Sequence, residues 1–94
     1  MFRMTVEDVF AIRNRGVVAT GRVEGGTLRV GDTVQIDGAL EARVDAIEVF
    51  RKSIDQANVG DNIGVLFKGI EKSQLSRGSV LTSSSSAYAE APPI

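Results

Sequence analysis

The sequence contains no cysteine and no histidine. Without cysteine, the chain cannot form disulfides, thiolate metal sites or a thiol nucleophile, and this composition suits a reducing compartment. Without histidine, it also lacks the commonest general base and metal ligand. Few residues remain from which an active site could be built. We therefore expect no catalytic residue, no metal site and no cofactor, and we expect that the protein is not an enzyme.

An excess of charge and a long apolar run are also missing. Eleven basic side chains oppose 12 acidic ones, for a formal net charge of −1, so any contact with nucleic acid needs a local site rather than a basic face. No stretch approaches the roughly 18 apolar residues of a membrane span. The N-terminal segment carries Arg3, Glu7 and Asp8, unlike a signal peptide. We expect a cytoplasmic protein with no membrane partner.

A phosphate-binding loop is absent from the sequence. No GxxxxGK[ST] run occurs, and the ten glycines stand where turns are expected. We therefore expect this chain to bind no GTP.

What the sequence does contain is β-strand patterning cut by turn signals. In the run 17–36, VVATGRVEGGTLRVGDTVQI, β-branched residues are interrupted by Gly25-Gly26 and by Gly31-Asp32. Such punctuation favours antiparallel strands. The segments 6–13 and 17–24 predict a hairpin around Asn14-Arg15-Gly16, and Asp37-Gly38 predicts another.

The second half of the chain continues this pattern. The segment 41–50 predicts a strand with a bulge, with a helix as the alternative. Val59-Gly60-Asp61 repeats the turn at Val30-Gly31-Asp32 and leads into a β-rich run over 62–68. A single helical turn over 71–76 and a last strand over 79–82 complete the expected elements.

These segments predict an all-β fold of six to seven short strands in one domain over 1–82. A small open sheet would expose two edges, and closure removes them, so we expect a small closed antiparallel Greek-key β-barrel. Residues 83–94 are rich in serine, alanine and proline. This composition predicts a disordered tail.

Charged and aromatic residues gather in two places. Adjacent Glu7 and Asp8 point to opposite faces of a strand unless a bulge re-aims one of them, which makes solvated surface charge the default interpretation. A hydrolase that used these carboxylates with Glu48 and Asp61 is an open alternative without a nucleophile or base. The pentamer 48–52, EVFRK, is either a core aromatic flanked by surface charges or a ligand site in which Arg51 meets a phosphate.

Five segments together resemble domain 2 of elongation factor Tu in order and spacing. The resemblance implies a closed antiparallel β-barrel that helps to hold the aminoacylated 3′ end of tRNA. The segments are EDVF at 7–10, TGRVE at 20–24, EVFRKSID at 48–55, GDNIGVLFKGI at 60–70 and RGSVL at 77–81.

The resemblance also assigns site residues, each placed where the family has a contact. Glu48 would accept from the ribose hydroxyl of the terminal adenosine, and Arg51 would meet the ester and phosphate region. Phe10 has a second interpretation as a core residue. Asn14 stands where the family has glycine, beside the adenine slot, and asparagine tolerates a positive φ but adds a side chain where the ligand must come close. The pocket for the esterified amino acid maps onto Glu7, Asp8, Phe10, Thr20, Phe50 and Asn62, and the adenine slot maps onto Ile12, Val18 and Leu66.

The GTPase domain and second barrel of the family are not in this sequence. Because linked sites gain roughly 10²–10⁴ in avidity, we expect one pocket alone to bind an aminoacyl-tRNA end, or another RNA end, weakly. Two alternatives stay open. The barrel is a protein-interaction module that docks on a translational GTPase or the ribosome, or it is a fragment of a degraded elongation factor gene. The serine-rich tail favours a true chain end.

Overall fold

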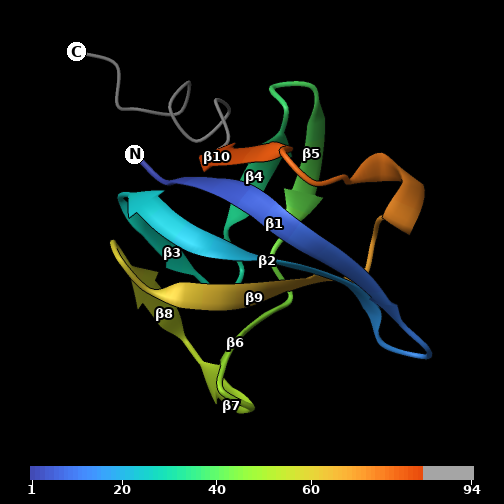
Figure 1. Cartoon of the computed structure of the whole chain (residues 1–94), viewed down its shortest axis with the longest axis horizontal. Coiled ribbons are helices and arrows are strands. Elements are labelled where there is room, and N and C mark those ends of the chain that lie inside the picture. Colours follow the sequence, from blue (N-terminus) through green and yellow to red (C-terminus); the bar gives the residue numbers. More distant parts are fainter. Residues whose placement is uncertain (84–94) are drawn as a thin grey trace.

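The structure, a computed structural model, describes residues 1–83 (Figure 1). Its secondary structure is almost entirely β, with one short 3₁₀ turn. The elements are β1 (Arg3–Ile12), β2 (Gly16–Gly25), β3 (Thr27–Arg29), β4 (Thr33–Ile36), β5 (Leu40–Arg43), β6 (Ala46–Val49), β7 (Lys52–Ile54), β8 (Gln56–Asn58), β9 (Asn62–Phe67), the 3₁₀ turn η1 (Lys72–Gln74) and β10 (Val80–Ser83).

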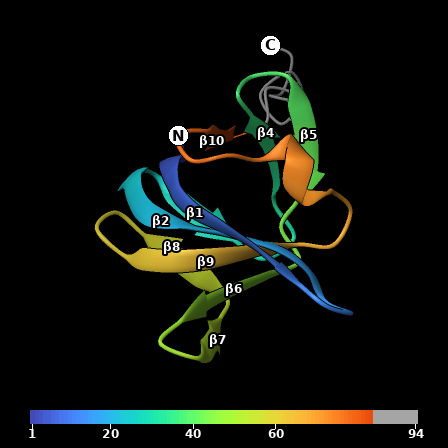
Figure 2. The ribbon, with the colours of Figure 1, turned by 45° about the vertical axis from the view of Figure 1, so that its right-hand side comes forward.

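Eight of the strands form one antiparallel sheet in the order β5-β4-β10-β1-β2-β9-β6-β7, and β3 pairs with β8 in a separate ribbon. The last strand, β10, returns to lie between β1 and β4, which is the long-range connection of a Greek-key arrangement. In both ribbon views β4, β5 and β10 lie at one end of the molecule and the β6–β7 hairpin projects at the other (Figures 1 and 2).

The large sheet curls into a half-barrel, which confirms the expected all-β antiparallel barrel fold. Its ladder ends at β5 and β7 rather than closing on itself. Backbone hydrogen bonds close part of the gap, because Gly31 N–H donates to Val44 O over 2.9 Å and Val30 N–H donates to Asp55 O over 3.0 Å. The two end strands are short, and β7 begins with a lysine, which discourages edge-to-edge pairing.

The core lies on the concave side of the sheet and follows the period of two expected for half-buried strands. In β2 the burial pattern alternates, so that Val17, Ala19 and Val23 point inward. Phe67, the last residue of β9, is fully buried among them. Inward apolar residues from most strands thus form one continuous core. Within residues 1–83, no helix has the length and apolar character needed to cross a lipid bilayer.

The two Val-Gly-Asp turns use the same hydrogen bonds. In the first turn, the Asp32 carboxylate accepts from Arg29 N–H over 2.8 Å. In the second, the Asp61 carboxylate accepts from Asn58 N–H over 2.8 Å. Gly31 and the equivalent glycine of the second turn both have a φ near +95°, a conformation that favours glycine. The repeated motif is therefore one turn structure used twice.

Several element predictions need correction. The segment 41–50 is neither a helix nor one bulged strand, because β5 pairs with β4 whereas β6 pairs with β9. The strands β7 and β8 were not expected, and together with this split they raise the number of strands within residues 1–83 to ten. Ser83 belongs to β10, and its hydroxyl accepts from Phe2 N–H over 2.8 Å. The rest of the expected tail, 84–94, lies outside the described residues.

Candidate functional site

A cavity of about 310 Å³ lies where β2, β6 and β9 run side by side, next to the β6–β7 hairpin. Register places Thr20 opposite Gly64, and Gly64 opposite Glu48, so the three strands contribute adjacent residues. Seven of the eleven predicted site residues meet here. The cavity is lined by Glu7, Val18, Thr20, Gly21, Glu48, Val49, Phe50, Arg51, Asn62, Ile63 and Gly64.

A β-bulge separates the two neighbouring carboxylates of β1. The register with β2 shifts between Val6 and Asp8, so Glu7 is the extra residue of the bulge and lines the cavity. Asp8 instead pairs with Arg77, whose Nη2 lies 2.9 Å from Asp8 Oδ1. That ion pair borders a second cavity of about 320 Å³, which Lys72 also lines. Glu7 and Asp8 therefore border two different cavities.

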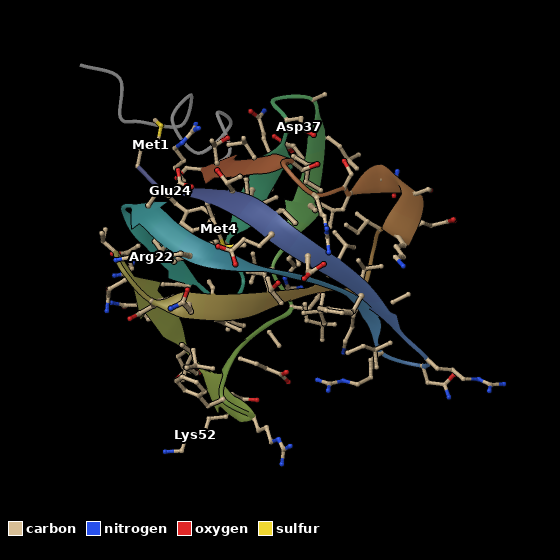
Figure 3. The ribbon with its side chains drawn as sticks, viewed as in Figure 1. Met1, Met4, Arg22, Glu24, Asp37 and Lys52 are labelled. Atoms are coloured by element: carbon tan, nitrogen blue, oxygen red, sulfur yellow. The ribbon has the colours of Figure 1, made fainter. Side chains whose placement is uncertain are left out.

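The β6–β7 hairpin carries the most unusual backbone near the cavity. Val49 pairs with Lys52, so Phe50 and Arg51 form a two-residue loop. Both have positive φ, 49° and 68°, which is the type I′ pattern that normally selects Asn-Gly. The Phe50 side chain is 92% exposed. Figure 3 shows Lys52 projecting from the same hairpin, away from the body of the molecule.

The left-handed backbone conformations of Phe50 and Arg51 cost conformational free energy. Each non-glycine residue held there costs on the order of 1 kcal/mol, and such strain clusters at functional sites. Because Phe50 is almost fully exposed, packing within the described chain does not explain its presence. The strained loop therefore marks the cavity rim as a candidate binding surface.

Glu48 is the acceptor on the cavity wall. Its Oε2 accepts from Arg15 Nη2 over 3.0 Å, and the two side chains are about one-third and one-half exposed. A carboxylate can accept several hydrogen bonds, so the contact with Arg15 leaves capacity for a ligand hydroxyl. Gly64 keeps the wall beside it open, because a Cβ added there would lie 3.1 Å from Val18 Cγ1.

Four of the predicted site residues do not line this cavity. Asp8 borders the second cavity, as described above. Phe10 is 51% exposed, so its interpretation as a core residue is wrong. Ile12 ends β1 beside Gly16 and is 37% exposed. Leu66 is buried, flanked in register by Val18 and Ala46, so its side chain contributes to packing next to the cavity rather than to its surface.

Sequence reasoning missed four lining residues, which are Gly21, Val49, Ile63 and Gly64. Gly64 had a signal, because a glycine inside a β-rich run indicates a bulge or a close approach. Gly21 had the same signal: a Cβ there would lie 2.4 Å from Thr5 O. Val49 and Ile63 had none, since branched aliphatic residues in strands are usually core.

The sequence model of the family "Elongation factor Tu domain 2" matches residues 16–82, well over half of the chain. The chain belongs to the elongation factor Tu domain 2 family. The match contains the cavity-lining residues of β2, β6 and β9, together with the strained hairpin. It begins after β1, so Glu7, Asp8, Phe10 and Ile12 lie outside it. Of these four, only Glu7 reaches the cavity, through the bulge in the pairing of β1 with β2.

Family membership makes this chain a translation-factor-like domain and points to translation-related partners. The cavity offers a matching set of groups: two carboxylate acceptors at Glu7 and Glu48, a guanidinium at Arg51, an amide at Asn62 and an exposed aromatic face at Phe50. Such a set can bind a ligand that combines hydroxyls, an anionic group and a flat ring.

Proposed function

We propose that this elongation factor Tu domain 2 binds the aminoacylated 3′ end of tRNA in the cavity between β2, β6 and β9. The observation that carries the proposal is the convergence of Glu48 and Arg51, from the β6–β7 hairpin, with Asn62 of β9 on one cavity. Membership of the elongation factor Tu domain 2 family and the groups that line the cavity both support the proposal.

Each group has a chemical task in this proposal. Single-stranded RNA ends are recognised by packing of the unpaired base and by contacts to the 2′-hydroxyl. Glu48 accepts from the ribose hydroxyl, and Val18 gives the base an apolar wall. Arg51 offers a charge-assisted hydrogen bond to the phosphate or the ester carbonyl. Phe50 and Asn62 then face the esterified amino acid, together with Glu7 and Thr20.

The proposed role is binding without catalysis. No bond of the ligand is broken or formed, and the chain binds no GTP. A single pocket of this size holds only the end of a tRNA, so the affinity is in the weak range that linked domains would raise roughly 10²–10⁴-fold. The proposed setting is the cytoplasm, where aminoacyl-tRNA is found.

The proposal is tested with a hydrolysis-resistant aminoacyl-adenosine, in which an amide replaces the ester, and two arginine variants. Arg51→Ala should weaken binding about 10- to 100-fold, because it removes a charge-assisted hydrogen bond worth on the order of 1.5–3 kcal/mol. Isothermal titration calorimetry or NMR titration at millimolar ligand gives the affinities.

Arg29→Ala is the matched control. Arg29 lies on β3, away from the cavity lining, and its Nε donates to Gln56 Oε1 over 3.1 Å. This variant removes the same charge and should leave the affinity unchanged. Equal losses for the two variants would show nonspecific charge attraction and would refute the proposed site.

A further inference from the structure

Arg15 contacts the cavity wall from outside the cavity. Its Nη2 lies 3.0 Å from Glu48 Oε2, although the two residues are 33 positions apart in sequence. Glu48 lines the cavity and Arg15 does not. An exposed pair of this kind adds only about 0–1 kcal/mol to folding stability. Its position, on the proposed acceptor of the ribose hydroxyl, suggests a different role.

The turn between β1 and β2 holds the Arg15 backbone in a defined conformation. Arg15 N–H donates to Ile12 O over 3.0 Å, which closes the turn. Asn14 has a φ of 66° and Gly16 a φ of 139°. No other residue fits at Gly16, because an added Cβ would lie 2.4 Å from Phe67 O on β9. The turn is thus packed against β9, and the guanidinium extends from a fixed base.

The Arg15–Glu48 ion pair affects how readily the Glu48 carboxylate can bind a ligand. Two carboxylates, those of Glu7 and Glu48, line the cavity with one guanidinium, that of Arg51. Arg15 adds a second cation beside Glu48. A free glutamate side chain samples several rotamers, and fixing it costs entropy when a ligand binds. A glutamate already held at one oxygen presents the rest of its carboxylate without that loss.

We infer that Arg15 is a positioning residue, which fixes the Glu48 carboxylate so that the cavity distinguishes a ribose from a 2′-deoxyribose at the nucleic-acid end. This inference rests on the proposed function for its ligand. It goes beyond that function in two respects. Arg15 does not contact the ligand itself, and it controls the selectivity between ribose and 2′-deoxyribose. The ion pair keeps one oxygen of Glu48 on Arg15 and leaves the carboxylate oriented toward the 2′-hydroxyl.

The test compares the amide-linked aminoacyl-adenosine with its 2′-deoxy analogue on wild type, Arg15→Gln, Arg15→Lys and Arg13→Gln. The wild type should prefer the ribose compound by about 10-fold, the effect of one hydrogen bond to a charged group. Arg15→Gln should reduce this ratio to about 3-fold or less, and Arg15→Lys should restore part of it. Arg13→Gln changes an exposed arginine of the same segment and should leave the ratio unchanged.

A ligand-free measurement separates this inference from the proposed function. Three-bond couplings of the Glu48 side chain, measured by NMR, should report one dominant rotamer in wild type and averaging in Arg15→Gln. Averaged couplings in wild type would overturn the inference, whether or not a ligand binds. A fixed Glu48 together with no binding of either compound would refute the proposed function alone.

Two binding results would also overturn the inference. An unchanged ratio in Arg15→Gln would show that Glu48 needs no partner. A gain in affinity for both compounds would show that Arg15 blocks the carboxylate rather than orienting it. Circular dichroism of each variant checks that the fold is intact, which the low stability contribution of an exposed ion pair predicts.

Discussion

Single glycines determine how closely the strands around the cavity approach one another. At Gly21 of β2, an added Cβ would lie 2.4 Å from Thr5 O and 3.2 Å from the Met4 side chain. At Gly69, after β9, nothing lies within 4 Å of an added Cβ. Neither glycine has a positive φ, so an added methyl group at either site is limited by the surrounding space and not by backbone strain.

We predict that Gly21→Ala destabilises the domain by about 1–3 kcal/mol, because overpacking forces β1 and β2 apart. Gly69→Ala should change the free energy of unfolding by about 0.5 kcal/mol or less, as expected for an exposed position. Urea denaturation of both variants measures the difference. Equal stability of the two variants would mean that β1 and β2 are not as close as described.

Glu24, also on β2, carries a pH-dependent part of the stability. Its carboxylate accepts from Arg3 Nε over 3.0 Å and from Thr5 N–H over 3.2 Å. Hydrogen bonding to the Thr5 side chain, followed by the contacts with Arg3 and the Thr5 amide, lowers the pKa of Glu24. A carboxyl group with a lowered folded-state pKa stabilises the fold fully above its unfolded-state pKa, about 4.3. That contribution is lost as the pH falls through the folded-state value.

We therefore predict that Glu24→Gln flattens the fall in melting temperature as the pH drops below about 4.3. Near pH 7 the variant should be slightly less stable than wild type, and the two should converge in acid. Glu7→Gln, at an exposed glutamate of β1, serves as control. A Glu24→Gln melting curve that stays parallel to that of wild type at every pH would contradict the assignment.

The sequence alone identified several residues suited to ligand binding, but it did not show which residues lie next to them in the fold. Glu48, Arg51 and Asn62 stand in motifs whose spacing matches the family, and the structure brings them to one cavity. Leu66 could not be placed, because it breaks the alternation of β9 and is buried between two neighbouring strands. The separation of Glu7 from Asp8 depends on a bulge whose position follows from pairing, not from local sequence.

The β6–β7 hairpin is the element in which local stability and the proposed function conflict. A two-residue loop with positive φ at both positions favours Asn-Gly, whereas this loop is Phe50-Arg51. Replacing both residues by Phe50→Asn and Arg51→Gly should stabilise the fold by about 1–2 kcal/mol. The same change should abolish binding of the aminoacyl-adenosine.

Thermal denaturation and calorimetric titration of this double variant measure the two effects. A variant that is more stable and still binds would show that the hairpin is not part of the site. A variant that is less stable would show that Phe50 packs on the fold despite its exposure.

Local sequence predicted the long strands and several short ones, such as β4 and β10, but it missed β7, β8 and the break between β5 and β6. The β1–β2 hairpin was predictable from its β-branched residues and from the turn at Asn14, whose φ of 66° is a conformation that asparagine tolerates. β7 and β8 have three residues each and few apolar ones, so they carry no periodic signal. The break between β5 and β6 arises because each pairs with a different partner strand.

For the whole molecule, the topology explains why the cavity exists. β2 and β9 lie at the centre of the sheet, and β6 extends it on one side, so the cavity wall is built on paired strands rather than on loops. Only its rim, the β6–β7 hairpin, projects from the body (Figure 2). A rigid wall with an exposed rim suits a site that holds the end of a long ligand.

The central claim is that this cavity binds an aminoacylated adenosine. Titration of ¹⁵N-labelled protein with the amide-linked aminoacyl-adenosine, followed by NMR to millimolar ligand, tests it most directly. We expect saturable shifts at Thr20, Glu48, Arg51 and Asn62, with little change at Arg29 or around the Arg77–Asp8 ion pair. Unshifted signals at the four cavity residues, or equal shifts across the surface, would contradict it.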